Sequence, residues 1–324
     1  MRLILTIGVC GAVFLAGFPA VAQERLISEE TSDGGFYVGT GVTKLQANEI
    51  VWAGNHRLSH LIWQSTAPVL RAGFDVNFAD GWTFKANGSA AMGGDSHMED
   101  YDWIDYDDGG PYVPSDNWDD WTHRSEHPDT RLDHYIALDA AIGYDVLHTP
   151  EFTANVNVGL KYTDVKWTAF GGSGLYSDVA FRDDPWVLPD GVRVIDFNQK
   201  WPVVFAGLDT EYRSGAFSFG VGAKAGVTFK ANDIDNHYLR DPDGLKFLDY
   251  LRPAPMVSIA ANASYAVSDL SDLFLAVEYE RIYEARGDVD IYSLGSGTYL
   301  GSATDAVGGD FQSLMVTGGF KGRF

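Results

Sequence analysis

Cysteine is nearly absent from this sequence, and long apolar runs and positive charge are scarce. The one cysteine, Cys10, lies close to the N-terminus, so the rest of the chain has no disulfide and no thiol chemistry. Beyond residue 22 no stretch of ~18 apolar residues is uninterrupted, which excludes a membrane-spanning helix. Lys and Arg number 23 against 45 Asp and Glu, a formal net charge of −22. That balance argues against a nucleic-acid partner, because phosphate binding needs a basic face, whereas acidic surfaces attract basic peptides.

The first 22 residues predict a secretory signal peptide. Arg2 supplies a positive charge, residues 3–18 form an apolar run relieved only by small residues, and residues 20–22 offer an A-x-A cleavage site. We expect residues 1–22 to be removed together with Arg2, which leaves a net charge of −23. The remaining residues, 23–324, show no linker or internal repeat and are expected to form one domain.

Alternation of apolar and polar residues is the main structural signal. Between Phe217 and Phe229 every second residue is apolar, and the residues between them are polar or glycine. In a water-soluble sheet the apolar face would be the core, whereas in a transmembrane barrel it faces lipid and the polar face lines the lumen. The last segment repeats the alternation and ends in Phe324, which resembles the terminal signal of outer-membrane barrels. These patterns favour a barrel over the alternative, a soluble periplasmic β-sandwich.

Ten such segments predict an all-β fold, a ten-stranded antiparallel transmembrane β-barrel with long extracellular loops. The segments lie near residues 34–48, 56–75, 80–93, 131–147, 151–171, 201–214, 215–232, 254–268, 270–288 and 310–324. Tight turns near residues 77–81, 148–150, 213–215 and 268–270 alternate with long connections at 94–130, 172–200, 233–253 and 289–309; the first outer connection, near 49–55, is short. Short periplasmic turns and long outer loops are usual in such barrels, and an even number of strands places both termini in the periplasm.

Acidic residues are concentrated in the first long connection. Residues 95–120 contain ten acids and no Lys or Arg: Asp95, Glu99, Asp100, Asp102, Asp105, Asp107, Asp108, Asp116, Asp119 and Asp120. A solvated acidic loop that binds divalent cations has the same composition. However, Asp100 and Asp102 point to the same side of an extended backbone. Carboxylates held that close cannot both ionise freely, which suits a tuned proton-transfer group.

A second cluster is D-x-D-x-H over residues 233–237, after the alternating strand described above. Asp235 and His237 share a face of an extended backbone, and a carboxylate beside an imidazole raises its basicity, as a general base acting on water requires. The alternative is an exposed loop histidine with an incidental acidic neighbour. The cluster continues the lipid-facing parity of its strand, so we expect a bulge near Ala231 or a strand that turns inward. Either would break the pairing or change the facing between Phe229 and Asp235.

Three blocks of sequence resemble the omptin family of outer-membrane endopeptidases. They are M-E-D-Y-D-W at residues 98–103, W-T-H-R-S-E-H-P-D-T at residues 121–130 and D-I-D-N-H-Y at residues 233–238. The blocks stand in the family's order, and the likeness covers essentially the whole chain after the signal peptide. The resemblance implies a ten-stranded outer-membrane barrel that cleaves peptides beside basic residues and requires lipopolysaccharide for activity.

The resemblance also implies catalytic roles for the two clusters. Asp235 and His237 would activate a water molecule. Asp100 and Asp102, across the cleft, would help hold that water and stabilise the tetrahedral intermediate through a shared proton. No covalent acyl-enzyme would form, and no metal or other cofactor would be needed.

Substrate recognition is implied by two further carboxylates. Glu49 and Asp233 would form the base of the S1 pocket and select Arg or Lys through charge-assisted hydrogen bonds, bidentate for Arg. The family's W-T-D is W-T-H here, with His123 in place of an Asp that helps recognise the residue after the scissile bond, P1′. The resemblance therefore predicts Arg or Lys at P1, but a basic residue at P1′ only if Asp119 or Asp120 replaces the missing acid.

A lipid-facing group of residues is implied as well. Tyr162, Asp164 and Lys166 continue the outward parity of the segment near 151–171, and Lys200 continues that of the next segment. The resemblance implies that these residues bind the phosphates of lipopolysaccharide above the apolar band. Lysines stand where the family typically has arginines, and lysine lacks the planar guanidinium. The alternative is a surface ion pair between Asp164 and Lys166.

Two other functions fit a barrel of this kind. One is a non-catalytic omptin-like barrel that acts as an adhesin or as a structural outer-membrane protein. The other is a small channel, although ten strands leave a narrow lumen for side chains to fill. The combination of Asp100, Asp102, Asp235 and His237 favours the protease, because no requirement of the fold needs all four. We expect a monomer in the outer membrane with its site facing the extracellular side.

Overall fold

The computed structural model describes residues 34–106, 115, 117–240 and 242–324. The predicted signal peptide, with Cys10, lies outside these residues, as do Asp107, Asp108 and Asp116 of the acidic run. The described residues form fourteen β-strands and one short 3₁₀ helix, η1 (Trp118–Asp120). Within them, no helix has the length and hydrophobicity to cross a membrane.

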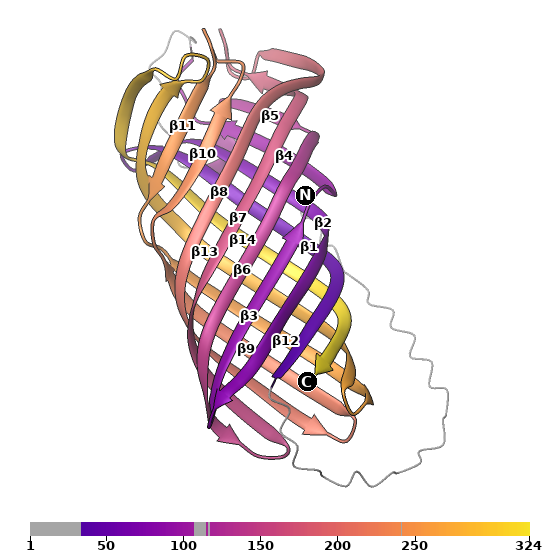
Figure 1. Ribbon diagram of the computed structural model, residues 1–324. Coiled ribbons are helices and arrows are strands. Elements are labelled where there is room, and N and C mark those ends of the chain that lie inside the picture. The colour runs from indigo at the N-terminus through magenta and orange to yellow at the C-terminus, as the bar shows by residue number, and fades with distance from the viewer. Residues whose placement is uncertain (1–33, 107–114, 116, 241) are drawn as a thin grey trace. The chain divides into compact units, whose positions relative to one another are not determined.

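Ten of the strands form a closed antiparallel ring (Figure 1). They are β1 (Gly34–Ala53), β2 (His56–Ala79), β3 (Trp82–Ala91), β6 (Asp129–His148), β7 (Phe152–Tyr176), β8 (Asp184–Ser214), β9 (Phe217–Thr228), β12 (Pro255–Ser268), β13 (Ser271–Ser293) and β14 (Tyr299–Arg323). Each pairs with the next, and β14 pairs with β1, so that Gly35 lies opposite Arg323. The all-β fold and the ten strands predicted from the sequence are confirmed. The four predicted tight turns each join two neighbouring strands of this ring.

The prediction of long outer loops is wrong in one respect, because strands occupy much of the predicted connections at 94–130 and 233–253. Four further strands continue β3, β6, β9 and β12: β4 (Asp95–Asp102), β5 (His123–His127), β10 (Ala231–His237) and β11 (Leu245–Leu251). β4 pairs with β2 and β5, and β5 with β7. On the other side β10 pairs with β8 and β11, and β11 with β13. A second ten-stranded level therefore extends the barrel, at the end opposite to the C-terminus (Figure 1).

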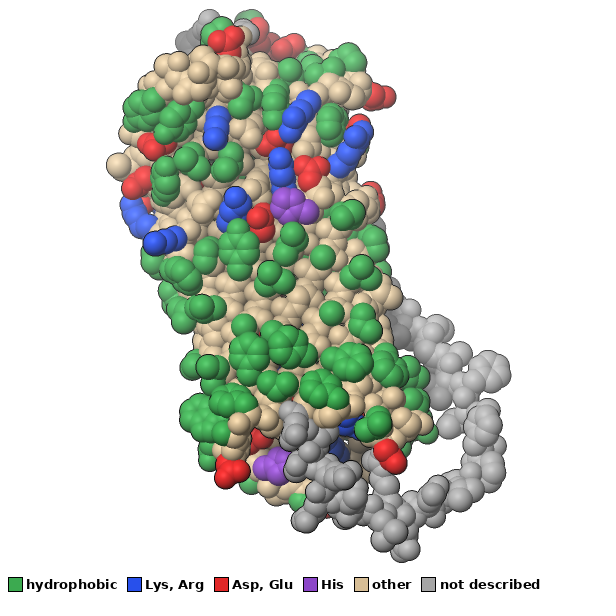
Figure 2. Space-filling view, in the orientation of Figure 1, with side chains coloured by type: hydrophobic (Ala, Val, Ile, Leu, Met, Phe, Trp, Pro, Cys, Tyr) green, Lys and Arg blue, Asp and Glu red, His purple; other side chains and the backbone are tan. Residues whose placement is uncertain are grey.

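The outside of the first level is apolar. Alternate residues of β9, among them Phe217, Val221 and Val227, are about half exposed, and so are Leu314 and Val316 of β14. Figure 2 shows a broad band of apolar side chains on the lower part of the surface, with most of the charged side chains above it and a few at the bottom edge. Such a wide apolar surface is typical of the lipid-facing side of a transmembrane barrel. The predicted facing of β9 and of the last strand is confirmed.

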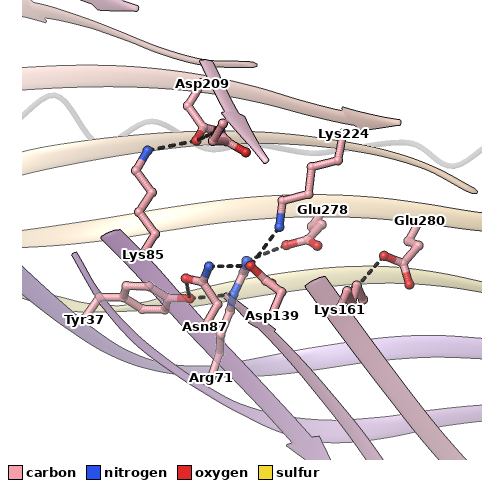
Figure 3. A network of polar contacts seen from close by, with 11 residues as sticks. Tyr37, Arg71, Lys85, Asn87, Asp139, Lys161, Asp209, Lys224, Glu278 and Glu280 are labelled. Atoms are coloured by element: carbon pink, nitrogen blue, oxygen red, sulfur yellow. Dashed lines mark hydrogen bonds and ion pairs between the residues drawn. The ribbon is translucent and has the colours of Figure 1, made fainter. Parts of the chain in front are cut away.

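The inside of the first level is polar and filled with ion pairs (Figure 3). The pairs are Arg71–Glu278, Lys161–Glu280, Lys224–Asp139 and Lys85–Asp209. Each of these cations has a carboxylate partner, as burial of charge requires. The cavity lined by Arg71, Tyr135 and Glu278 has a volume of about 10 Å³, room for roughly one water molecule. Side chains therefore close this level of the barrel.

A β-bulge separates β9 from β10. On β8, Val203 lies opposite Thr228 and Lys200 lies opposite Asn232, so three steps along β8 match four steps along its partner. Lys230, inside the extra step, has a φ of 51°. A one-residue shift exchanges the two faces of a strand. The predicted break between Phe229 and Asp235 is therefore confirmed.

The same kind of shift separates β3 from β4. On β2, Val69 lies opposite Ala91 and Ser65 lies opposite Ser96, so four steps match five. The register also shifts within β6 and within β13. These bulges allow the chain to present one set of alternate residues to the lumen at the first level and the other set at the second.

Candidate active site

β4 carries Asp100 and Asp102, and Asp100 is buried. Ser59 on β2, the register partner of Asp102, donates a hydrogen bond from Oγ to Asp100 Oδ1 at 3.2 Å. Burial raises the pKa of Asp100, although the nearby His237 and the Ser59 hydrogen bond oppose this effect. Burial and the charge of Asp100 raise the pKa of Asp102 well above its ordinary value. The two carboxyl groups therefore retain a proton where isolated carboxyl groups are fully ionised.

β10 carries the acid–imidazole dyad that the sequence suggested. Asp235 is fully buried, and its Oδ2 is paired with Nε2 of His237. The imidazole stands edge-on to the ring of Phe247 on β11, with 5.4 Å between the ring centroids. Because Nε2 faces the carboxylate, Nδ1 is the nitrogen that can accept a proton from water.

The two clusters face each other across the inside of the second level. In the ring of hydrogen-bonded strands β4 and β10 are separated by β5, β7 and β8. Even so, among the charged groups that shift the pKa of Asp100, His237 has the largest effect, and Asp235 also contributes. The structure thus brings together all four residues that the sequence singled out, and it does so only because β4 and β10 follow bulges.

Three more carboxyl groups lie beside the dyad. Glu49 on β1 and Asp233 on β10 were predicted from the sequence, and both are buried. Burial, followed by the charges of Asp235 and Asp233, raises the pKa of Glu49 well above its ordinary value. Burial also raises the pKa of Asp233 to about 7, with a smaller contribution from Asp235 and an opposing hydrogen bond from Asp249. Asp249, on β11 opposite Asp233, is a fully buried residue that sequence reasoning missed.

His123 lies where the resemblance suggested an acid. On β5 it is the register partner of Asp102. Its Nδ1 is 2.9 Å from Thr122 Oγ1, and its ring centroid is 4.7 Å from that of Tyr176. Burial and the charge of Arg240 lower the pKa of His123. This side of the site therefore has a neutral imidazole and a neighbouring cation.

The rest of the described acidic run is not one loop. Glu99, on β4, forms an ion pair with Arg124 at 3.0 Å. Asp119 and Asp120 are exposed on η1, and Asp120 accepts a hydrogen bond from Ser115 Oγ at 2.6 Å. No group of three or more metal-ligating side chains suited to an ion is found among the described residues.

The four residues predicted to contact lipopolysaccharide lie together on the outer surface. Tyr162, Asp164 and Lys166 alternate along β7, and Asp164 is the register partner of Lys200 on β8. Figure 2 shows basic side chains above the apolar belt on the face that β6, β7 and β8 form. The sequence therefore placed this group correctly on the outward face.

Their polar partners were not predicted. Asp164 Oδ1 lies 2.9 Å from His134 Nε2 and accepts a hydrogen bond from Asn198 Nδ2 at 2.6 Å. Lys166 Nζ lies 3.9 Å from Asp196. The alternative ion pair between Asp164 and Lys166 is thus replaced by contacts with other strands. His134 follows the bulge in β6, so its outward facing could not be read from strand parity.

Comparison with known proteins agrees with this architecture. The sequence model of the omptin family matches residues 34–324. The plasminogen activator of Yersinia pestis is 28% identical over 323 residues, covering 96% of each chain. Protease 7 of Escherichia coli K12 is 27% identical over 275 residues, 84% of this chain and 83% of that protein. The crystal structure of the outer membrane protease OmpT from Escherichia coli covers 93% of this chain and 99% of its own, with a TM-score of 0.81 and 23% identity, which shows a common fold.

Proposed function

The chain belongs to the omptin family, and we propose that it is an outer-membrane endopeptidase that cleaves peptides after Arg or Lys. Its relatives include a protein named protease 7 and one named outer membrane protease OmpP, which supports peptidase activity in the outer membrane. The observation that carries the proposal is the His237–Asp235 pair facing the Asp100–Asp102 pair inside the barrel. No requirement of barrel stability explains this arrangement, since burying unpaired carboxylates destabilises a fold.

In the proposed reaction a water molecule lies between the two pairs. Nδ1 of His237 takes a proton from the water as its oxygen attacks the scissile carbonyl carbon, and the Asp235 carboxylate stabilises the resulting imidazolium. The proton held by Asp100 and Asp102 forms a hydrogen bond to the developing oxyanion. The imidazolium then protonates the leaving amine, and the C–N bond breaks. Water is the nucleophile throughout, and no acyl-enzyme forms.

Selection of Arg or Lys at P1 is assigned to the buried acids beside the dyad. Glu49 and Asp233 lie on different strands, β1 and β10, and both have raised pKa values because they are buried among other carboxyl groups. A cationic side chain between them would favour their ionised forms and form charge-assisted hydrogen bonds with them. At P1′, His123 and Arg240 give no reason for a basic preference.

Lipopolysaccharide is the proposed activator, bound at Tyr162, Asp164, Lys166 and Lys200. Two lysines above the apolar belt suit its phosphate groups, and His134 adds a third nitrogen-bearing side chain. The site-bearing end would face the extracellular side, because the described chain begins and ends at the other end, where the turns are short. A closed ring leaves no free strand edge at its first level, which is consistent with a monomer.

One experiment tests the proposal. Refolded protein is incubated with lipopolysaccharide and a randomised peptide library, and the cut sites are mapped by mass spectrometry. We expect cleavage after Arg or Lys with no preference for a basic residue at P1′. The variants His237→Ala and Asp100→Ala should each lose cleavage of an Arg-containing peptide while the barrel still folds. Unchanged hydrolysis in either variant would reject the assigned roles.

A further inference from the structure

Asp249 has no role in the proposed function, yet it is fully buried beside the site. It lies on β11 directly opposite Asp233 on β10, and both side chains have 0% exposure. Like charges directly opposite each other destabilise a sheet, and burial of an unpaired carboxylate is unfavourable. The fold therefore gains nothing from this pair, which points to a ligand as the reason for it.

No cation of the described chain neutralises the pair. Both oxygens of Asp233, both of Asp249 and Oε2 of Glu49 have no hydrogen-bonding partner among the described residues, apart from a proton that the two aspartates can share. The charges of Asp233 and Asp235 on β10 raise the pKa of Asp249, and the charge of Asp249 raises the pKa of Glu49 on β1. Its register partner on β13 is the apolar Val289. Acceptor oxygens from three strands thus lie together without a donor.

The backbone of β14 passes close to these oxygens at a glycine. Gly309 on β14 lies opposite Glu49. A Cβ atom at Gly309 would approach Gln199 Nε2 to 2.9 Å and Asp233 Oδ2 to 3.4 Å, so a side chain at this position would crowd these groups. Within the described residues the carboxyl groups are not arranged as a set of metal ligands. The unpaired acceptor oxygens therefore suit an organic cation that enters from the mouth of the barrel.

We propose that Asp249 is a specificity-determining residue of the S1 pocket, where it acts with Glu49 and Asp233 to bind the guanidinium of a P1 arginine in preference to the ammonium of lysine. This inference rests on the proposed function. A guanidinium has five N–H donors spread over a plane, whereas an ammonium is a compact point charge. Carboxylates on three strands offer separated acceptors, and a planar group can reach more than one of them at once.

Because binding of the cation releases a proton, this role predicts that substrate binding depends on pH. When a cation enters, the proton shared by Asp233 and Asp249 leaves, because the guest favours the ionised form of both groups. At low pH the proton is held tightly, and Asp249 behaves like a neutral amide. The contribution of Asp249 to substrate binding is therefore expected to grow as the pH rises.

The test uses Asp249→Asn, whose amide has the shape of a protonated carboxyl group. Two peptides that differ only in Arg or Lys at P1 are cleaved with lipopolysaccharide in excess. For the Arg peptide we expect kcat/KM to fall about tenfold or more near pH 8.5 and by less than about threefold near pH 6, mainly through KM. The ratio of Arg to Lys cleavage should fall as well. Asp290→Asn, on the neighbouring strand β13, removes the same charge outside the pocket and should change neither quantity.

Each other result overturns the assignment. An equal loss at every pH would mean that Asp249 only supports the local structure, and an unchanged Arg peptide rate would mean that it has no role. Inhibition by millimolar Ca²⁺ or Zn²⁺ in the wild type but not in Asp249→Asn would make the pocket a metal site. If the wild type cleaves neither peptide, the proposed function fails. Calorimetric titration with argininamide and lysinamide then decides whether Asp249 still favours a guanidinium.

Discussion

Replacement of Asp235 by Asn tests the proposed mechanism most directly. Asp235 is fully buried, and its carboxylate faces Nε2 of His237. An Asn side chain keeps the shape and can still accept a hydrogen bond through its carbonyl oxygen. It removes the negative charge that stabilises the imidazolium formed when His237 takes a proton from water. The ground state should therefore change little, whereas the transition state should lose a charged partner.

The expected size of the effect follows from this contact. General-base catalysis by a positioned side chain contributes about 10²–10⁴-fold to a rate, which corresponds to roughly 3–5 kcal/mol in the activation free energy. Asp235 also raises the pKa of Glu49, after the larger effect of burial. Its neutralisation therefore makes the pocket acids easier to ionise. We expect kcat to fall by about 10²–10⁴-fold while KM for an Arg peptide stays the same or decreases.

Steady-state kinetics with a fluorogenic Arg peptide and excess lipopolysaccharide measure both constants. The matched control is Asn236→Ala, on the same strand but with its side chain directed to Asp196; it should retain most of the activity. Gel mobility with and without heating reports whether each barrel has folded. A decrease in kcat of less than about tenfold, or an increase in KM with kcat unchanged, would refute the role of Asp235 in water activation.

Four further results are expected. KM for an Arg peptide should rise as the pH falls below about 7, because burial raises the pKa of Asp233 to about 7 and only its ionised form attracts the cation; KM for a peptide with neutral citrulline at P1 should not show this dependence. Lys200→Glu places a negative charge opposite Asp164, so a lipopolysaccharide titration should show half-activation at a severalfold higher concentration. Lys230→Gly should raise the free energy of unfolding by about 1 kcal/mol with unchanged activity, because φ is 51° at this position; thermal melting measures it. His123→Asp should produce a preference for basic residues at P1′ in the peptide library.

The first level of the barrel could be predicted well from the sequence, and the second could not. Lipid on one side and a polar lumen on the other impose strict alternation, as in the strand from Phe217. Above the lipid both faces of a strand are polar, and β4 (D-S-H-M-E-D-Y-D) and β5 (H-R-S-E-H) show no apolar face. Their place in the barrel comes from pairing with strands distant in sequence, which a local pattern does not contain.

The candidate site shows the same limit. Asp100, Asp102, Asp235 and His237 could be selected because each pair lies within three residues and matches a family block. Asp249 could not, because its importance comes from the register between β10 and β11, across a segment that looked like a loop. Local spacing predicts which residues can act together on one strand, whereas the partners on other strands require the fold.

The bulges explain how one chain satisfies both levels. Within the lipid, the outward face is fixed by apolar side chains, and the residues continuing that face along β9 are Asp233, Asp235 and His237. A regular strand would direct these groups outward, away from the lumen. The extra residue at Lys230 turns them inward, and the equivalent shift before β4 does the same for Asp100. The site thus depends on the position of single inserted residues, so deletion of Lys230 should abolish cleavage even if the apolar belt, and with it the membrane-spanning barrel, remains intact.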